Sequence, residues 1–312
     1  MVPAFFSKAM ILFNCDYSEG AHADILRRMA ETNMEQTTGY GEDPYCDQAR
    51  KLIAGLCGRT DLDIHFLIGG TQTNFTVIAA ALRPHQCVLC ADTGHINVHE
   101  SGAVEACGHK VSAIPSPDGK LTARQIEEAW HAHWDDETRE HMPQPRMVYI
   151  SQPTELGTIY SRKELQEISG VCRRRGLYLY MDGARLGYGL CDEDNDLDLP
   201  AIASLCDAFY IGGTKVGALF GEALVLRHEA LKEDFRYIAK QKGGRLAKGR
   251  LLGIQFLELF RDGLYFRLGA HADRLAVMLR DFCRSRGLAL PFSSGTNQQF
   301  VTMPDSVLEE LG

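Results

Sequence analysis

Short runs of apolar residues alternate with longer amphipathic segments along most of this chain, which contains 312 residues. Runs such as L-Y-L-Y-M and A-F-Y-I are typical of strands that are buried on both faces of a sheet. The longer segments between them repeat their apolar positions with the period of a helix. The pattern predicts strands near residues 64–68, 86–90, 110–114, 146–151, 177–181, 207–211 and 222–227, and helices near residues 46–57, 71–82, 122–134, 161–175, 228–242 and 246–260.

This alternation of strands and helices favours an α/β fold with three αβα layers, in which a mostly parallel sheet carries helices on both faces. A chain of this length buries a large core and commonly divides into domains. We expect an N-terminal segment at residues 1–15, a large domain at residues 16–235 and a smaller C-terminal α+β domain at residues 236–312.

The composition is that of an ordinary globular enzyme, with 45% apolar and 24% charged residues. A net charge of -8 gives no support to binding of nucleic acid or of an anionic membrane. The apolar stretch at residues 1–13 is interrupted by Lys8 and is too short to span a bilayer. We therefore predict a cytoplasmic protein with no membrane segment.

The cysteines raise the question of a metal site. A C-x2-C-x4-H-x3-H spacing that resembles a zinc site is formed by Cys87, Cys90, His95 and His99. The same cysteines also fit a core strand as small apolar residues, and we favour that interpretation and predict no metal. The acidic run at residues 191–198 lacks the glycine and the closing glutamate of a calcium loop. Ten cysteines without a pairing pattern are typical of a reducing compartment.

Lys215 is the first candidate for chemistry, because it follows the apolar run 207–211 after two glycines and a threonine. The carboxyl ends of core strands are where α/β proteins bind ligands. Burial there lowers the pKa of an ammonium group, and a neutral amine can condense with an aldehyde. This segment taken alone favours a solvated loop lysine, and the residues upstream change that balance.

Asp182 is the second candidate, because it ends the run 177–181 and is followed by Gly183. A carboxylate at such a position can keep the ring nitrogen of pyridoxal phosphate protonated. Lys215 follows it by 33 positions (215 minus 182), which is enough for a crossover helix and another strand. The alternative role for Asp182 is a helix N-cap. The combination with Lys215 favours the cofactor role.

A phosphate-binding turn is predicted where Gly69 and Gly70 separate a strand from a helix. The amides of Gly70, Thr71 and Gln72 would point out of the helix N-terminus, a geometry that binds phosphate. The segment is neither a Walker loop nor a G-x-G-x-x-G fingerprint, so nucleotide binding is not indicated.

Longer stretches carry a family resemblance between about Phe13 and Phe300. In chain order they are F-N-C-D-Y-S-E-G-A-H, G-Y-G-E-D-P-Y, T-G-H-I-N-V-H-E-S-G-A, T-E-L-G-T-I-Y-S, M-D-G-A-R-L, T-K-V-G-A and G-G-R-L-A-K-G-R-L-L-G. Together they resemble the threonine aldolase group of β-eliminating lyases, which are fold-type I pyridoxal-phosphate enzymes. The resemblance implies an aspartate-aminotransferase-type fold and a homodimer or homotetramer with shared active sites.

The same resemblance implies retro-aldol cleavage of L-threonine or L-allo-threonine to glycine and acetaldehyde, with pyridoxal phosphate as cofactor. Lys215 would form a Schiff base with the cofactor, and Asp182 would bind the pyridinium nitrogen. His95 would stack on the ring and help to move the hydroxyl proton. The resemblance further implies cofactor contacts from Gly70, Thr71, Gln72, Arg185 and Thr214, substrate contacts from Cys15, Tyr40 and Arg185, and phosphate contacts from a neighbouring subunit through Arg245, Lys248 and Arg250.

Two departures from the family pattern affect these expectations. The segment S-Q-P-T-E at 151–155 stands where threonine aldolases often carry E-N-T-H-N, so a second histidine near the substrate hydroxyl is absent. The chain also stops at V-L-E-E-L-G, before a strand that carries a carboxylate-binding arginine in the family. We therefore expect an incomplete small domain and weakened activity.

Two other functions remain compatible with the same residues. A β-eliminating lyase that acts on another amino acid would use the same lysine and aspartate and would release pyruvate. A non-catalytic protein with this fold would form no product. The sequence does not choose between threo and erythro substrates.

Overall fold

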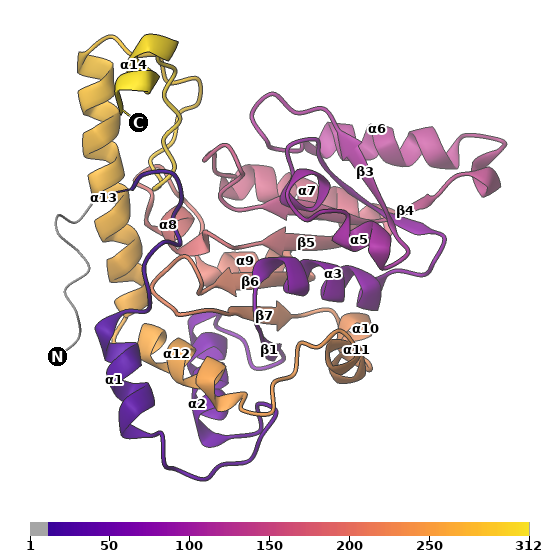
Figure 1. The fold of residues 1–312 in the computed structure, drawn as a ribbon. Helices are drawn as coiled ribbons and strands as arrows, with labels where there is room; N and C mark the ends of the chain where they lie inside the picture. Colours follow the sequence, from indigo (N-terminus) through magenta and orange to yellow (C-terminus); the bar gives the residue numbers. More distant parts are fainter. Residues whose placement is uncertain (1–11, 312) are drawn as a thin grey trace.

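The computed structural model describes residues 12–311, so residues 1–11 of the predicted N-terminal segment and the final glycine lie outside the described residues. Its centre is a seven-stranded sheet in the order β1-β7-β6-β5-β4-β2-β3 (Figure 1). The strands are β1 (Asp63–Leu67), β2 (Gln86–Ala91), β3 (Lys110–Ile114), β4 (Gln144–Ser151), β5 (Tyr178–Asp182), β6 (Ala208–Gly212) and β7 (Glu222–Leu226).

The sheet is mostly parallel, as predicted. The neighbouring pairs from β6 through β5, β4 and β2 to β3 are parallel. The exception is β7, which runs antiparallel to both of its neighbours, β6 and β1. All strands expected from the apolar runs are confirmed, with small shifts at their ends.

Helices cover the sheet on both sides (Figure 1). They are α1 (Ala23–Glu31), α2 (Pro44–Leu56), α3 (Gly70–Ala81), α4 (His95–Val98), α5 (Ala103–Ala106), α6 (Ala123–Trp134), α7 (Arg162–Arg175), α8 (Leu186–Cys191), α9 (Leu199–Leu205), α10 (Glu229–Lys232), α11 (Phe235–Gln241), α12 (Arg250–Arg261), α13 (Leu264–Ser285) and α14 (Asp305–Leu311), with a 3-10 turn at Arg139–His141.

The predicted helices near 46–57, 71–82, 122–134 and 161–175 are confirmed. The prediction of one helix over 228–242 was wrong, because the chain breaks it into α10 and α11 at Asp234. That residue adopts a left-handed conformation with φ of 54°, which a continuous helix does not allow. The helix expected at 246–260 begins only at Arg250.

Alternation of side chains along the strands divides the interior into two cores, one on each face of the sheet. On β5, Leu179 and Met181 belong to the core that packs against α2, α7, α9 and α12. Tyr178 and Tyr180 belong to the opposite core, which packs against α3, α10 and α11. Because both faces of the sheet are covered, the predicted three-layer arrangement is confirmed.

The C-terminal part of the described chain contains the long helix α13, an isolated bridge between Ala289 and Thr302, and α14 (Figure 1). Gly269 of α13 packs directly against α8, because a Cβ at that glycine would lie 2.5 Å from the carbonyl oxygen of Gly187. The predicted domain boundary near residue 235 stays a prediction. None of the helices in residues 12–311 is both long and apolar enough to cross a membrane.

The cysteines are all free thiols. Cys87 and Cys90 lie buried on β2, where they pack as core residues. Within the described residues, no group of three or more His, Cys, Asp or Glu side chains is arranged to hold a metal ion.

Candidate active site

The predicted catalytic residues meet in one cleft at the carboxyl edge of the sheet. Neighbouring strands β4 and β5 end there at Ser151 and Asp182, and the loop after β6 brings Lys215 to the same edge. Lining the cleft are the predicted residues Lys215, Asp182, His95, Arg185, Thr214 and Thr71. Residues that are far apart in sequence therefore form a single site, where a parallel sheet places ligands.

Asp182 is almost fully buried, with 4% of its surface exposed, and is surrounded by hydrogen-bond donors. Its Oδ1 accepts hydrogen bonds from the hydroxyl of Tyr210 at 2.5 Å and from the amide of Ala184 at 2.9 Å. Its Oδ2 accepts from the hydroxyl of Tyr149 at 2.6 Å and from Nδ2 of Asn74 at 2.9 Å. All of these partners stabilise the ionised form of the carboxyl group.

The net effect is that the pKa of Asp182 lies below its ordinary value. Burial by itself would raise that pKa, but the hydrogen bonds from Tyr149 and Tyr210 and the nearby His95 outweigh it. The aspartate is therefore an anion held in a fixed position inside the protein. Such a group suits the role that the sequence predicted for it, as the partner of a positively charged ring nitrogen.

Strand alternation explains how the tyrosines reach Asp182. Tyr149, Tyr180 and Tyr210 lie on adjacent strands and belong to the same core. The hydroxyl of Tyr180 donates to Oδ1 of Asn74 at 2.7 Å, which fixes the amide so that its nitrogen faces Asp182. These polar groups are therefore part of the buried face of the sheet.

Gly183 allows the chain to turn tightly after Asp182. A Cβ at this position would lie 1.9 Å from the carbonyl oxygen of Tyr210, so no other residue fits without moving the backbone. The amide of Gly212 donates to the carbonyl oxygen of Gly183 at 2.9 Å, which ties the ends of β5 and β6 together. The turn that presents Asp182 is thus fixed by close backbone packing.

His95 begins the short helix α4 and is oriented by an acidic partner. Its Nδ1 lies 2.8 Å from Oε1 of Glu100, and that oxygen also accepts from Nδ2 of Asn74 at 2.7 Å. Burial works to lower the pKa of His95, but the hydrogen bond to Glu100 and the charge of Asp182 together raise it above its ordinary value. The raised pKa increases the share of the imidazolium form.

Lys215 lies partly buried in the cleft, and the pKa of its ammonium is lowered. Burial is the main cause, and the positive charge of Arg185 adds to it. The hydroxyl of Tyr188 donates to the carbonyl oxygen of Lys215 at 2.5 Å, which holds its backbone. A lowered pKa increases the share of neutral amine, the form that attacks a carbonyl carbon.

The loop before Lys215 is fixed by Glu222, a buried residue at the start of β7. Its Oε1 accepts from the hydroxyl of Thr214 at 2.8 Å, and its Oε2 accepts from the amide of Gly213 at 3.1 Å. Burial raises the pKa of Glu222 to about 8. Thr214 therefore acts first of all as a link that holds the lysine loop in place.

The predicted phosphate turn lies at the N-terminus of α3. The first backbone hydrogen bond of the helix joins the amide of Thr73 to the carbonyl oxygen of Gly69, at 3.0 Å. The preceding amides, of Gly70, Thr71 and Gln72, thus have no acceptor within the helix. The side chain of Gln72 is turned away, because it accepts from the amide of Ile68 and donates to the carbonyl oxygen of Lys242.

Arg185 lies between the cleft and a neighbouring pocket, and it is paired with Asp16. The Nε and Nη2 atoms of Arg185 donate to the two carboxylate oxygens of Asp16 at 2.6 and 3.1 Å, and Nδ2 of Asn297 donates to the same carboxylate at 2.9 Å. Cys15 lines the neighbouring pocket and not the cleft that contains Lys215. Its thiol lies 3.0 Å from the hydroxyl of Ser18.

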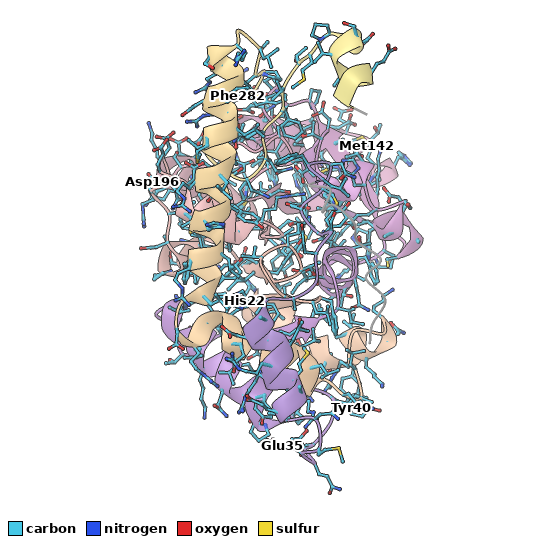
Figure 2. The ribbon with its side chains drawn as sticks, turned by 60° about the vertical axis from the view of Figure 1, so that its left-hand side comes forward. His22, Glu35, Tyr40, Met142, Asp196 and Phe282 are labelled. Carbon is cyan, nitrogen blue, oxygen red and sulfur yellow. The ribbon has the colours of Figure 1, made fainter. Side chains whose placement is uncertain are left out.

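Tyr40 is, with Cys15, a predicted substrate residue that the described chain does not bring to the cleft of Lys215. It lines a different pocket with Arg245, whose Nη2 donates to the carbonyl oxygen of Tyr40 at 2.7 Å. Figure 2 shows Tyr40 and Glu35 near the end of the molecule formed by α1 and α2. Arg250 is near them, since it donates to the carbonyl oxygen of Glu35 at 2.8 Å, whereas Lys248 is exposed.

Several residues of the site were not predicted from the sequence. Glu100 and Asp16 lie within motifs that carry the family resemblance, and this position could have marked them as candidate site residues. Glu155 stands within the segment S-Q-P-T-E and lines the cleft. Four other site residues follow the regular pattern of their helix or strand, so nothing in the sequence marks them as functional: Asn74, Tyr149, Tyr210 and Glu222.

Comparison with known proteins agrees with this geometry. A family model described as beta-eliminating lyase matches residues 15–306. A low specificity L-threonine aldolase from Pseudomonas aeruginosa is 32% identical over 303 residues, which cover 96% of this chain and 86% of that protein. Another, from Pseudomonas sp., is 33% identical over 310 residues with the same coverage.

Solved structures show the same relationship. The structure of Leishmania major threonine aldolase has a TM-score of 0.93 and 48% identity, and the match covers 96% of this chain and 86% of that one. A Thermus thermophilus aspartate aminotransferase, at 14% identity, has a TM-score of 0.70 over 89% of this chain and 73% of that one, which confirms the predicted fold. The chain therefore belongs to the beta-eliminating lyase family, as an enzyme of its threonine aldolase group.

Proposed function

We propose that this protein binds pyridoxal phosphate and cleaves L-threonine or L-allo-threonine to glycine and acetaldehyde. The observation that carries the proposal is the pairing of groups in one cleft. Asp182 is a buried anion with a lowered pKa, and Lys215 is an amine with a lowered pKa. A buried carboxylate next to a partly desolvated lysine is the combination that this cofactor requires.

The donor set of the cleft fits the cofactor at each of its ends. Asp182 offers an anion to the ring nitrogen, and Lys215 offers an amine to the aldehyde. The helix N-terminus at Gly70 offers free amides and a positive dipole to the phosphate. Thr71 lines the same cleft and is exposed, so its hydroxyl could donate a hydrogen bond to a phosphate oxygen bound at this turn.

When bound, pyridoxal phosphate withdraws the electron pair that remains on Cα after the bond from Cα to Cβ breaks. The side chains of this protein supply attachment, orientation and proton transfer. Lys215 would attach the cofactor, and Asp182 would keep its ring nitrogen protonated. His95, with Nδ1 bound to Glu100, would cover the ring and leave its other nitrogen for proton transfer.

Arg185 is the proposed partner of the substrate carboxylate. A guanidinium group binds carboxylates in a forked geometry, and in this structure it binds the carboxylate of Asp16 in that way. The substrate carboxylate would compete with Asp16 for the same donors. This contact orients the substrate so that the bond to be broken is the one between Cα and Cβ.

We also propose a homodimer or homotetramer in which a neighbouring subunit completes the site. Tyr40, Arg245, Lys248 and Arg250 are the residues that the family resemblance places near the substrate or the phosphate. Tyr40 and Arg245 line a pocket separate from the cleft that contains Lys215. A contact between subunits would allow such residues of one chain to reach the cleft of the other.

Product analysis tests the proposed reaction directly. The protein is supplied with pyridoxal phosphate and a mixture of L-threonine, L-serine and L-cysteine, and the products are identified by mass spectrometry. We expect glycine and acetaldehyde from threonine, and no product from the Lys215→Ala variant. Pyruvate without acetaldehyde would replace the aldolase proposal with β-elimination.

A further inference from the structure

Glu155 is a partly buried carboxylate in the cleft, and neither the family resemblance nor the proposed cofactor contacts give it a role. It lies in the loop after β4 and lines the cleft together with His95, Asp182 and Lys215. It ends the segment S-Q-P-T-E, which lacks the second histidine of the family pattern, and it also belongs to T-E-L-G-T-I-Y-S, a stretch that carries the resemblance.

The two oxygens of Glu155 have different surroundings. Oε1 accepts hydrogen bonds from the amide of His95 at 2.9 Å and from the hydroxyl of Ser151 at 2.6 Å. Oε2 accepts no hydrogen bond from the part of the chain that the structure describes, and it is not among the fully covered polar atoms. The carboxylate is therefore anchored through one oxygen, while the other faces the free space of the cleft.

The anchors of Glu155 are themselves rigid. Ser151 is the last residue of β4, and His95 is the first residue of α4. The loop is closed by a hydrogen bond from the amide of Thr154 to the carbonyl oxygen of Thr158 at 2.8 Å. A carboxylate held in this way keeps one orientation, which proton transfer requires.

The surroundings also make Glu155 a better base than an exposed glutamate. Burial raises its pKa, and the nearby charge of Asp182 adds to the effect, although the hydrogen bond from Ser151 opposes it. His95 is the neighbouring candidate, but its Nδ1 already faces Glu100, and its raised pKa increases the share of the imidazolium form, which cannot accept a proton.

We propose that Glu155 accepts the proton of the substrate β-hydroxyl during the cleavage step. The inference rests on the proposed aldolase function. The O–H proton moves to Oε2, the O–H electron pair forms the C=O bond of the aldehyde, and the bond from Cα to Cβ breaks. Its electron pair stays on Cα, which then takes up a proton and gives glycine. Glu155 later releases its proton to solvent, so atoms and charges balance.

The test uses Glu155→Gln in the full-length protein. Glutamine keeps Oε1 as an acceptor for Ser151 and His95, but it replaces the free oxygen by an amide nitrogen, which cannot accept a proton. Threonine cleavage should fall by about 100-fold or more, the usual contribution of a general base. Exchange of the glycine α-proton in D2O, followed by NMR, should be retained, because it involves no β-hydroxyl.

Matched variants separate this role from a structural one. Glu155→Asp retains a proton acceptor and should cleave threonine faster than Glu155→Gln. Glu167→Gln, at an exposed position of α7, should behave as the wild type. The melting temperature of each cofactor-free variant should match that of the wild-type protein, which shows that the fold is retained.

The outcomes distinguish this inference from the function on which it rests. If the wild type forms acetaldehyde and Glu155→Gln does so equally fast, the role of Glu155 is overturned and the aldolase function stands. Loss of both cleavage and glycine exchange in the variant would overturn proton transfer in favour of a structural role. A wild type that forms no acetaldehyde would overturn both proposals.

Discussion

At the scale of single residues, the charge of Asp182 depends on partners that sequence patterns do not reveal. Lys215 and Asp182 were predicted from their positions after core strands, whereas His95 was predicted from the family resemblance. Asn74 donates to Asp182 across a separation of 108 residues, and its role appears only after the helix packs on the sheet. Tyr149 and Tyr210 are core residues and follow the apolar pattern of their strands, so the sequence does not reveal that their hydroxyls bind Asp182.

Tyr210→Phe tests this dependence. Removing the hydroxyl deletes a hydrogen bond that lowers the pKa of Asp182, while the effect of burial remains. A hydrogen bond to a charged group contributes about 1.5–3 kcal/mol, so the Kd of pyridoxal phosphate should rise roughly 10-fold or more. Spectroscopic titration of the cofactor at pH 7 measures this loss.

Tyr178→Phe is the control for this variant, because Tyr178 lies on the same face of β5 but at the opposite end of the strand. It should bind the cofactor as the wild type does. Equal cofactor affinity in both variants would show that the hydroxyl of Tyr210 does not stabilise the charge of Asp182.

His65 provides a separate prediction about acid stability. Its ring lies 4.8 Å from that of Phe235, its Nε2 is covered, and burial lowers its pKa from 6.5 to about 3. Below pH 6.5 the unfolded chain takes up a proton that the folded chain excludes, so stability falls as the pH falls. The slope from this group reaches about 1.4 kcal/mol per pH unit between these pKa values.

His65→Leu removes this titration and keeps an apolar side chain at the site. Chemical denaturation at pH 7 and pH 5 should show a smaller loss of stability in the variant than in the wild type. The same loss in both proteins would mean that His65 is protonated in the folded state.

At the scale of elements, the helices that were predicted well have strong local signals. Ser161 and Glu164 form a capping box at the start of α7, and Gly176 ends the helix in a left-handed conformation. Where such signals conflict with the apolar pattern, the prediction failed. The break at Asp234 and the start of α12 depend on packing and backbone conformation that periodicity does not contain.

Ser161→Ala should destabilise the protein by about 1 kcal/mol, the usual contribution of an N-cap side chain. The serine hydroxyl accepts a hydrogen bond from the amide of Glu164, and alanine leaves that amide without an acceptor. Ser161→Thr keeps the hydroxyl and should be close to the wild type. Thermal unfolding measures both variants, and equal melting temperatures would contradict a contribution from the cap.

At the scale of the whole molecule, the fold was the most predictable property, because the alternation of strands and helices alone indicates it. The apolar pattern did not predict the helix α13 at Leu264–Ser285. This helix leaves Leu275, Met278, Leu279 and Phe282 exposed, so its apolar positions do not mark a face packed on the sheet. Figure 2 shows Phe282 toward the C-terminal end of α13, well separated from Tyr40.

A mixing experiment tests the shared site. Lys215→Ala chains lack the attachment residue, and Lys248→Ala chains lack an exposed cation that is a candidate for the phosphate of a neighbouring subunit. Each variant alone should be inactive or weak. When they are refolded together, some mixed oligomers contain one intact site, so the mixture should be more active than the sum of its parts. An activity equal to that sum would contradict a role for Lys248 across the interface.

The position of β1 has a consequence for how this protein is made. Within residues 12–311, β1 is an edge strand that pairs only with β7, and Leu67 pairs with Glu222. A ribosome adds roughly 5–20 residues per second. β1, which precedes the Gly70 turn, therefore leaves the ribosome many seconds before β7, the strand with which it pairs. A nascent chain that already contains Asp182 and Lys215 therefore lacks the partner of β1, and with it a fixed Gly70 turn, until β7 has been synthesised.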